Sequence, residues 1–446
     1  MRRTTLNIVI SFFFLIGFYQ AISQELITRG PYLQKVTQTS IIIRWSTDIP
    51  TDSQVKYGGS KWGLNTIITD TLFTLDHSIE VTGLDTSTIY FYSVGSSSLI
   101  LSGATDNHYF KTLPTKGEIG DYTFVALGDA GTGNQGQYDV KDAILDYKGS
   151  HYDGILLLGD NAYDSGTQQQ YQDKFFDSIY YELFENTVIW PSPGNHDYYG
   201  ASVPLTPTAA YFDIFDCPKA GESGGVPSGL EQYYSFDYGN IHFISLDSYG
   251  VSRMDDGKMA KWLRSDLAAD TMLWTIAYWH HPPYTKGSHD SDNLTLNDSE
   301  LVQMREQIVP ILESYGVDLV LSGHSHCYER SYLINGHYGP SSSLTNDHII
   351  DNGTGSYPVD CPYLKYSYSQ DESPGTVYSV VGVSGRVSGV QQGWPHPVMA
   401  SYAIWTYGAL ILNINDFSLT AEFLTDKGEV YDTYTIMKNI AFTENG

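Results

Sequence analysis

Basic side chains are scarce in this sequence. It has 24 Lys and Arg against 51 Asp and Glu among 446 residues, which gives a formal net charge of -27. Proteins bind a nucleic-acid backbone through Lys and Arg side chains that displace its counterions. The composition therefore argues against a nucleic-acid partner. It also predicts that an anionic ligand must be attracted locally, against the field of the whole molecule.

Cysteine is equally scarce, with only Cys217, Cys327 and Cys361 present. An odd number leaves at least one thiol outside any disulfide in an oxidising compartment. Cys217 and Cys361 both lie in loop-like stretches that contain Gly or Pro, and these two could pair. We expect Cys327 to be buried, and the sequence leaves the disulfide open.

Long apolar runs are missing except near the N-terminus, between about Ile8 and Tyr19. Arg2 and Arg3 precede this run and small residues follow it at Ala21-Ile22-Ser23, a pattern that predicts a cleaved secretory signal over residues 1–23. The alternative is an uncleaved anchor, although the run is shorter than the ~20 residues of a membrane span. Cleavage would leave 22 basic and 51 acidic side chains, a net charge of -29. We therefore expect a secreted or periplasmic protein with no membrane partner.

The remaining sequence is rich enough in apolar residues, 41% against 17% charged, to form two packed domains. Residues 24–115 are predicted to form the first domain. Short β-branched and aromatic runs separated by turn residues favour a small antiparallel sandwich there. These runs are residues 40–45, 54–58, 77–81 and 88–94. We find no constellation of metal-ligand residue types among them.

Beyond a short linker at residues 116–120 the pattern changes to α/β, and residues 120–446 are predicted to form the second domain. Strand-like runs alternate there with helical stretches, such as the one in which Tyr171, Phe175, Ile179 and Leu183 recur every four residues. The predicted strands are residues 122–127, 155–158, 187–190, 241–246, 273–279, 317–321, 376–381 and 409–414.

Five short segments place metal-type side chains directly after strand-like runs. Asp129 and Asp160 each follow a buried strand, and open α/β sheets hold their ligands at the carboxyl ends of strands. A single Gly-Asp pair would be ordinary as a turn or helix cap, but five such segments predict a two-metal hydrolase. They are Gly128-Asp129-Ala130-Gly131, Gly159-Asp160-Asn161-Ala162-Tyr163, Gly194-Asn195-His196-Asp197, His280-His281-Pro282-Pro283-Tyr284 and Gly323-His324-Ser325-His326.

The imidazoles are harder to explain structurally than the carboxylates. His324 and His326 lie one residue apart after a strand, and His280 follows another strand. Any one histidine is ordinary on a surface or in a core, whereas three in this setting indicate metal ligands. Asn195 could supply a neutral oxygen ligand and leave His196 free to carry protons. The same two side chains could equally satisfy the backbone of their loop.

The order and the residues of the five segments resemble those of the calcineurin-like metallophosphoesterases, and Tyr163 narrows the resemblance to the purple acid phosphatase family. Residues 29–34 and 43–45 are similar to that family's N-terminal domain, and residues 375–378 resemble its late core strand. Nearly all of the chain after residue 23 is covered. The resemblance implies a fibronectin type III-like sandwich followed by an αββα metallophosphoesterase domain.

The resemblance also implies a binuclear metal centre. Fe³⁺ would be bound by Asp129, Tyr163 and His326, with Asp160 bridging to a second ion, and charge transfer from Tyr163 would make the protein purple. In this family the histidine segment reads His, any residue, Pro, so His280 and not His281 is the ligand. The second ion, Zn²⁺, Mn²⁺ or Fe²⁺, would be bound by Asn195, His280 and His324.

The implied activity is acid phosphatase: hydrolysis of phosphate monoesters by attack of metal-bound hydroxide at phosphorus. We expect His196 to protonate the leaving group or to steady the phosphate. His289 resembles a histidine of the family that contacts substrate, although an ordinary exposed histidine in a mobile loop is the alternative. The sequence of residues 281–287 differs from that of the best-known plant enzymes, which leaves the range of small phosphate-ester substrates open.

Three alternatives stay open at this stage. A phosphodiesterase or nucleotidase would use the same two-metal site. An iron-free hydrolase would keep Tyr163 as a structurally neutral residue. A binding protein with a decayed metal domain should have lost a ligand, whereas all seven ligand-type side chains are present. The sequence makes no prediction about the oligomeric state.

Overall fold

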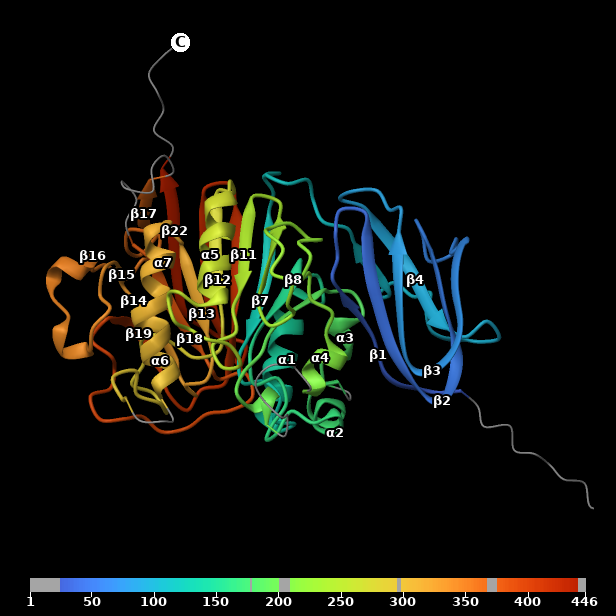
Figure 1. Ribbon diagram of the computed structural model, residues 1–446, viewed down its shortest axis with the longest axis horizontal. Helices are drawn as coiled ribbons and strands as arrows, with labels where there is room; N and C mark the ends of the chain where they lie inside the picture. The colour runs from blue at the N-terminus through green and yellow to red at the C-terminus, as the bar shows by residue number, and fades with distance from the viewer. Residues whose placement is uncertain (1–24, 177–178, 200–208, 295–297, 367–374, 440–446) are drawn as a thin grey trace, which may run out of the picture.

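The computed structural model describes residues 25–176, 179–199, 209–294, 298–366 and 375–439. Within these ranges an all-β region comes first and an α/β region follows it (Figure 1). The predicted signal over residues 1–23 lies outside the described residues. None of the described helices is both long and apolar enough to cross a membrane.

The N-terminal region is a six-stranded antiparallel sheet built around one long strand, β2. β2 pairs with β1 through its first half and with β4 through its second half, while β3 follows it through both. We predicted two strands where β2 is continuous, and register shifts between Ser46 and Ser53 mark the place where it bends. The strands are β1 (Ile27–Gln34), β2 (Ser40–Gly58), β3 (Thr66–Thr82), β4 (Ile89–Gly95), β5 (Ile100–Gly103) and β6 (Tyr109–Lys111).

The α/β region contains two seven-stranded mixed sheets. In the first, β7, β8 and β9 are parallel neighbours at one edge. Its strands, in spatial order, are β17 (Tyr363–Tyr366), β22 (Val430–Asn439), β21 (Ser418–Thr425), β20 (Gly408–Asn415), β7 (Tyr122–Leu127), β8 (Gly154–Leu158) and β9 (Ile189–Ser192).

In the second sheet β11, β12, β13 and β18 run parallel to one another. Its strands, in spatial order, are β10 (Tyr234–Tyr238), β11 (Ile241–Ser245), β12 (Trp274–Tyr278), β13 (Leu319–Ser322), β18 (Val377–Val381), β14 (Tyr328–Ser331) and β19 (Met399–Ala403). A separate two-stranded sheet joins β15 (Leu333–Ile334) and β16 (Ile349–Asp351).

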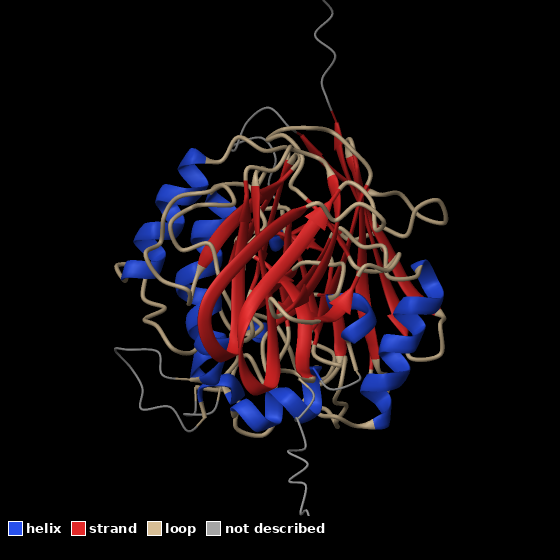
Figure 2. Ribbon diagram, turned by 90° about the vertical axis from the view of Figure 1, so that its right-hand side faces the viewer, coloured by secondary structure: helices blue, strands red, loops and turns tan. Residues whose placement is uncertain are grey.

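The two large sheets pack against each other, and helices cover their outer faces (Figure 2). β9 contacts β11 and β18 contacts β20 across the interior, while α1 lies against β20 and β21. On the other face Leu263 of α5 packs in one apolar cluster with Ala277 and Val320. This confirms the predicted αββα arrangement. The helices are α1 (Gln135–Lys148), α2 (Gln168–Tyr171), α3 (Tyr181–Phe184), α4 (Ala210–Ile214), α5 (Lys258–Ala269), α6 (Ser299–Gln303) and α7 (Val309–Ser314).

The helix predicted around Tyr171 is not continuous. α2 ends at Tyr171, a π-helical turn follows over Gln172–Phe176, and α3 begins only at Tyr181. All four apolar side chains of the predicted face are nevertheless buried. A second π turn, Met304–Ile308, joins α6 to α7.

Candidate metal centre

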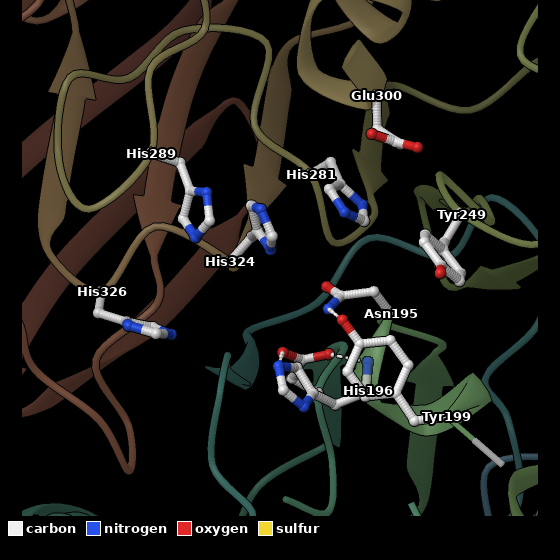
Figure 3. A pocket seen from close by; sticks show the side chains of 10 residues that line it. Asn195, His196, Tyr199, Tyr249, His281, His289, Glu300, His324 and His326 are labelled. Atoms are coloured by element: carbon white, nitrogen blue, oxygen red, sulfur yellow. Dashed lines mark hydrogen bonds and ion pairs between the residues drawn. The ribbon is translucent and has the colours of Figure 1, made fainter. Parts of the chain in front are cut away.

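The five predicted segments follow the carboxyl ends of five strands, three from one sheet and two from the other. β7, β8 and β9 lead into the segments with Asp129, Asp160 and Asn195, and β12 and β13 lead into those with His280 and His324. Because both sheets present these ends at the same place, one cluster collects side chains that are up to about two hundred residues apart in the chain. His196 and His289 border the same pocket (Figure 3).

The first half of the cluster contains Asp129, Tyr163 and His326. The Tyr163 hydroxyl donates to Asp129 Oδ1 over 2.6 Å and lies 3.4 Å from His326 Nε2. His326 Nε2 in turn lies 3.3 Å from Asp129 Oδ1. Carboxylate, phenol and imidazole atoms therefore lie close together in this half.

The second half contains Asp160, His280 and His324, whose ligand atoms all lie within 4.8 Å of one another. His280 Nε2 is 3.2 Å from Asp160 Oδ1 and also 3.2 Å from His324 Nδ1. All three residues are buried. A carboxylate and two imidazoles at such distances suit a divalent metal ion.

Neighbouring groups fix which atom each ligand presents. His280 Nδ1–H donates to the Leu158 carbonyl over 2.9 Å, so Nε2 keeps its lone pair for the cluster. The Asn195 amide nitrogen donates to the Tyr199 hydroxyl over 3.1 Å, which turns Asn195 Oδ1 away from that contact. These hydrogen bonds thus leave His280 Nε2 and Asn195 Oδ1, the atoms predicted to bind a metal, outside both contacts.

Buried polar atoms without partners test whether these residues suit metal ions. Asn195 Oδ1 and His324 Nε2 are buried and have no hydrogen-bond partner, although such atoms are nearly always satisfied in folded proteins. His280 Nε2 and His324 Nδ1 face each other at 3.2 Å. The oxygen and imidazole donor set and the unmet Asn195 oxygen fit a bound cation.

The backbone at three predicted ligands is in the left-handed region, with φ of 57° at Asp129, 54° at Asp160 and 65° at His324. Asp and His tolerate this region better than most residues, yet it carries strain of about 1–3 kcal/mol at each position. The conformation turns the chain sharply at the strand end. Gly194 is needed for a different reason, namely the close approach of Asp160. A Cβ at position 194 would lie 2.3 Å from Asp160 Oδ1, which is too close for both atoms to keep their positions.

Carboxylates from both halves of the cluster change the pKa of His280. Burial disfavours a charged His280, yet the carboxylates of Asp160 and Asp129 raise its pKa to about 9. Burial likewise opposes ionisation of Asp160, but His280 and His196 lower its pKa overall. Burial and the nearby Asp129 and Asp160 raise the pKa of Tyr163 well above its ordinary value. A tyrosinate at Tyr163 therefore requires a positive charge beside its oxygen.

His196 is held by its backbone and by one ring nitrogen. Its N–H donates to Asp160 Oδ1 over 2.9 Å, and Nδ1–H donates to the Asp164 carbonyl over 2.7 Å. Nε2 consequently faces the cluster, 3.8 Å from Asp160 Oδ2. Only this nitrogen is available for exchanging a proton with a bound molecule.

His289 lies in a loop that contains two ion pairs. Lys286 pairs with Asp290 and Asp292 at 2.5 and 2.9 Å, which closes the loop on itself. His289 Nδ1 lies 2.8 Å from Asp298 Oδ1, and the His289 ring lies 3.9 Å from that of His324. The histidine is partly exposed and borders the pocket.

Several residues at the site were not singled out from the sequence. Asp197 is buried and accepts hydrogen bonds from Gly194, Asn161 and Tyr171, which fixes the Asn195 loop against the Asp160 loop. Tyr249 and Glu300 border the pocket, which has a volume of about 380 Å³. Tyr249 lies in the loop that follows β11, so a search of the segments after strands would have found it. No comparable signal marks Glu300.

Arg386 was also missed. Its guanidinium carbon lies 4.8 Å from the centre of the Tyr163 ring, a cation–π distance. The three cysteines are all unpaired: Cys217 and Cys327 are buried and Cys361 is exposed. The structure thus leaves Cys217 and Cys361 apart and confirms the buried position of Cys327.

Comparisons with known proteins agree with this geometry. The calcineurin-like phosphoesterase profile matches residues 105–328, and that of the purple acid phosphatase N-terminal domain matches residues 31–112. The chain is similar to purple acid phosphatase 15 of Arabidopsis thaliana, 28% identical over 64% of this chain and 58% of that protein. It is also similar to a purple acid phosphatase of Glycine max, 28% identical over 89% of this chain and 80% of that protein.

Among solved structures, the chain resembles a purple acid phosphatase from yellow lupin seeds, Lupinus luteus. The TM-score is 0.67 at 16% identity, over 92% of this chain and 75% of that one. At this identity the likeness concerns the fold alone. The match spans little more than half the length of the first curated relatives, 53–58%.

Proposed function

We propose that this chain, which belongs to the calcineurin-like phosphoesterase family and within it to the purple acid phosphatases, hydrolyses phosphate monoesters with a binuclear metal centre. One observation carries the proposal. Side chains from the ends of five strands in two sheets meet in a buried cluster, and within it Asn195 Oδ1 and His324 Nε2 lack any partner.

We propose that the ligands divide into two sets. Asp129, Tyr163 and His326 would hold Fe³⁺, and Asn195, His280 and His324 would hold Zn²⁺, Mn²⁺ or Fe²⁺, with Asp160 between the two ions. When bound, such ions lower the pKa of water and stabilise charge on a transferring phosphoryl group. The protein contributes the fixed orientation of each donor atom through partners such as the Leu158 carbonyl and the Tyr199 hydroxyl.

We assign the proton transfers to histidines beside the cluster. His196 Nδ1 is occupied by the Asp164 carbonyl, so Nε2 is the atom that would protonate the leaving oxygen or bind the phosphate. With both ring nitrogens protonated, His289 would donate to a phosphate oxygen through Nε2–H while the Asp298 carboxylate accepts from Nδ1–H. Tyr199 and Tyr249 border the same pocket.

We also propose that the chain is exported and works outside the cytoplasm. The predicted signal over residues 1–23 supports export, as does the acidic composition, which suits a soluble enzyme. The proposed division of the remaining chain is an N-terminal domain over residues 24–115 and a catalytic domain over 120–446. N-terminal sequencing of the protein recovered from the medium or periplasm should begin near residue 24.

Phosphatase assays and a visible spectrum of the purified protein test the proposed function together. We expect turnover of phenyl phosphate that clearly exceeds turnover of diphenyl phosphate. We also expect iron by metal analysis and a purple or pink colour. Tyr163→Phe should remove the visible band, because the band requires the phenolate, while the far-ultraviolet circular dichroism stays unchanged.

Arg386→Gln serves as a matched control, since it changes a group that contacts the Tyr163 ring without removing the phenol. This variant should keep a visible band. A colourless, iron-free and active protein would overturn the iron assignment but not the phosphatase. Faster hydrolysis of the diester would instead favour a phosphodiesterase.

A further inference from the structure

One wall of the pocket faces His326, the proposed iron ligand, and consists of a carboxylate and two tyrosines. Glu300, Tyr249 and Tyr199 lie on one side of the pocket, and His326 and His289 lie on the other (Figure 3). A phosphate held by the metal cluster would direct its ester group toward this wall. The wall comes from the loop after β11, the first turn of α6 and the residue that follows the His196–Tyr198 turn.

Glu300 is the only charged side chain on this wall, and no Lys or Arg is among the described residues that line the pocket. Its side chain is 16% exposed. Arg253 Nη2 forms an ion pair with Glu300 Oε1 at 3.7 Å, a separation too long for a hydrogen bond, so the carboxylate keeps room for a second cationic partner. Arg253 Nη1 donates instead to carbonyl oxygens, including that of Tyr249.

The aromatic groups of the wall are held in fixed orientations. The Tyr249 ring stacks on His281 at 6.0 Å with an angle of 12° between the planes. The Tyr199 ring lies 4.6 Å from that of His196, and its hydroxyl accepts from Asn195. Aromatic faces beside a carboxylate attract a cation, and quaternary ammonium groups are bound in proteins by such surroundings.

We propose that Glu300, Tyr249 and Tyr199 form a leaving-group subsite that selects phosphate monoesters of amino alcohols, in which the ester carries an ammonium group. The inference rests on the proposed phosphatase function. The phosphate of such a substrate lies at the metal cluster and its ammonium group lies between the Glu300 carboxylate and the tyrosine rings. A second phosphate or a carboxylate at the same place would be repelled by Glu300 and by the net charge of -27.

A pair of substrates with the same shape tests this selectivity. Phosphocholine carries a trimethylammonium group, and 3,3-dimethylbutyl phosphate has a neutral carbon in place of its nitrogen. We expect kcat/KM to be about tenfold higher for phosphocholine, in keeping with a partly desolvated cation–π and charge contact. In Glu300→Gln the ratio should fall to about one to three, and Tyr249→Leu should lower it as well.

Glu306→Gln is the matched control, because Glu306 is an exposed carboxylate six residues further along the chain and outside the pocket. It removes the same charge from the molecule and should leave the ratio unchanged. The ratio also separates specificity from damage to the fold, since a misfolded variant loses both rates together.

These assays distinguish failure of the subsite from failure of the proposed phosphatase function. If wild-type protein hydrolyses both esters with equal kcat/KM, or if Glu300→Gln keeps the wild-type ratio, the subsite is wrong and the phosphatase stands. If neither ester nor phenyl phosphate is hydrolysed by metal-loaded protein, the proposed function itself fails.

Discussion

At the scale of single residues, the cluster depends on side chains that hold the ligands as much as on the ligands. Asp197 is the clearest example, because it is buried and accepts hydrogen bonds from the Gly194 N–H over 2.8 Å, from Asn161 Nδ2 over 3.0 Å and from the Tyr171 hydroxyl over 2.6 Å. These bonds hold the loop that carries Asn195 and His196 against the loop that carries Asp160.

Asp197→Asn should therefore misplace Asn195. An amide has one acceptor oxygen and would set its NH₂ group against donors, so we expect kcat/KM to fall by about 10- to 100-fold, as for other groups that orient metal ligands. Metal analysis should show partial loss of the ion expected at Asn195, with the iron retained. Tyr171→Phe removes only one donor and should have a smaller effect. Full activity and metal content in Asp197→Asn would contradict this account.

The candidate site was predictable to the extent that its residues follow strands. Asp129, Asp160, His280 and His324 occupy strand ends, and parallel strands bring their carboxyl ends together. Glu300 reaches the pocket from a helix, so its position depends on how α6 packs against the sheet. Local sequence does not encode that packing.

At the scale of secondary structure elements, most of the strands that we predicted lie within two residues of the observed bounds, because buried parallel strands are nearly continuous apolar runs. The helix around Tyr171 was predicted less well for a physical reason. A spacing of four residues exceeds the 3.6 residues of an α-helical turn, so the apolar side chains drift around a regular helix. The wider π turn over Gln172–Phe176 compensates for this drift and keeps Phe175 buried.

A network of buried ion pairs joins two strands of the second sheet to a helix that covers it. His242 of β11 lies 2.7 Å from Asp237 of β10 and 2.9 Å from Asp266 of α5. Burial disfavours the charged imidazole, but the two carboxylates raise the pKa of His242 to about 10. The hairpin is thereby attached to the helix that covers it.

The free energy of unfolding should fall as the pH rises. The folded-state pKa of His242 lies above its ordinary value of 6.5, so its contribution is fully present below pH 6.5 and is lost as the pH rises through about 10. We expect a loss of roughly a few kcal/mol over that window, measured as a decreasing urea midpoint at pH 6, 8 and 10.

His242→Gln should start at lower stability and show a flatter pH dependence. His151→Gln is the matched control, because His151 is exposed and should leave the wild-type slope in place. Parallel slopes in wild type and His242→Gln would mean that another group causes the pH dependence.

At the scale of the whole molecule, the all-β region is packed against the α/β region and the net charge is strongly negative. Arg44 donates to the carbonyls of Asp213 and Ile214 and to the Asp216 carboxylate, and the Tyr92 hydroxyl donates to the Glu185 carbonyl over 2.6 Å. The charge of -27 surrounds a pocket that must admit a phosphate. Long-range repulsion and local attraction therefore oppose each other during substrate binding.

Salt should increase the apparent second-order rate. Screening shortens the Debye length from about 30 Å at 0.01 M to about 8 Å at 0.15 M, which weakens the repulsion between the protein and a phosphate dianion. We expect kcat/KM for phenyl phosphate to rise by roughly two- to fivefold over this range, mainly through KM. Equal effects of sodium chloride and potassium acetate would exclude inhibition by a particular anion. A falling kcat/KM in both salts would mean that the local cations dominate the approach.

The distribution of the proposed ligands over both sheets also has a consequence for biosynthesis. Asp129 and Tyr163 follow strands of one sheet, and His280 and His324 follow strands of the other. These donors meet only after the two sheets have packed together, so the complete pair of ion sites does not exist in a partly folded chain. The ions available in the compartment where folding is completed would therefore decide which metals the protein carries.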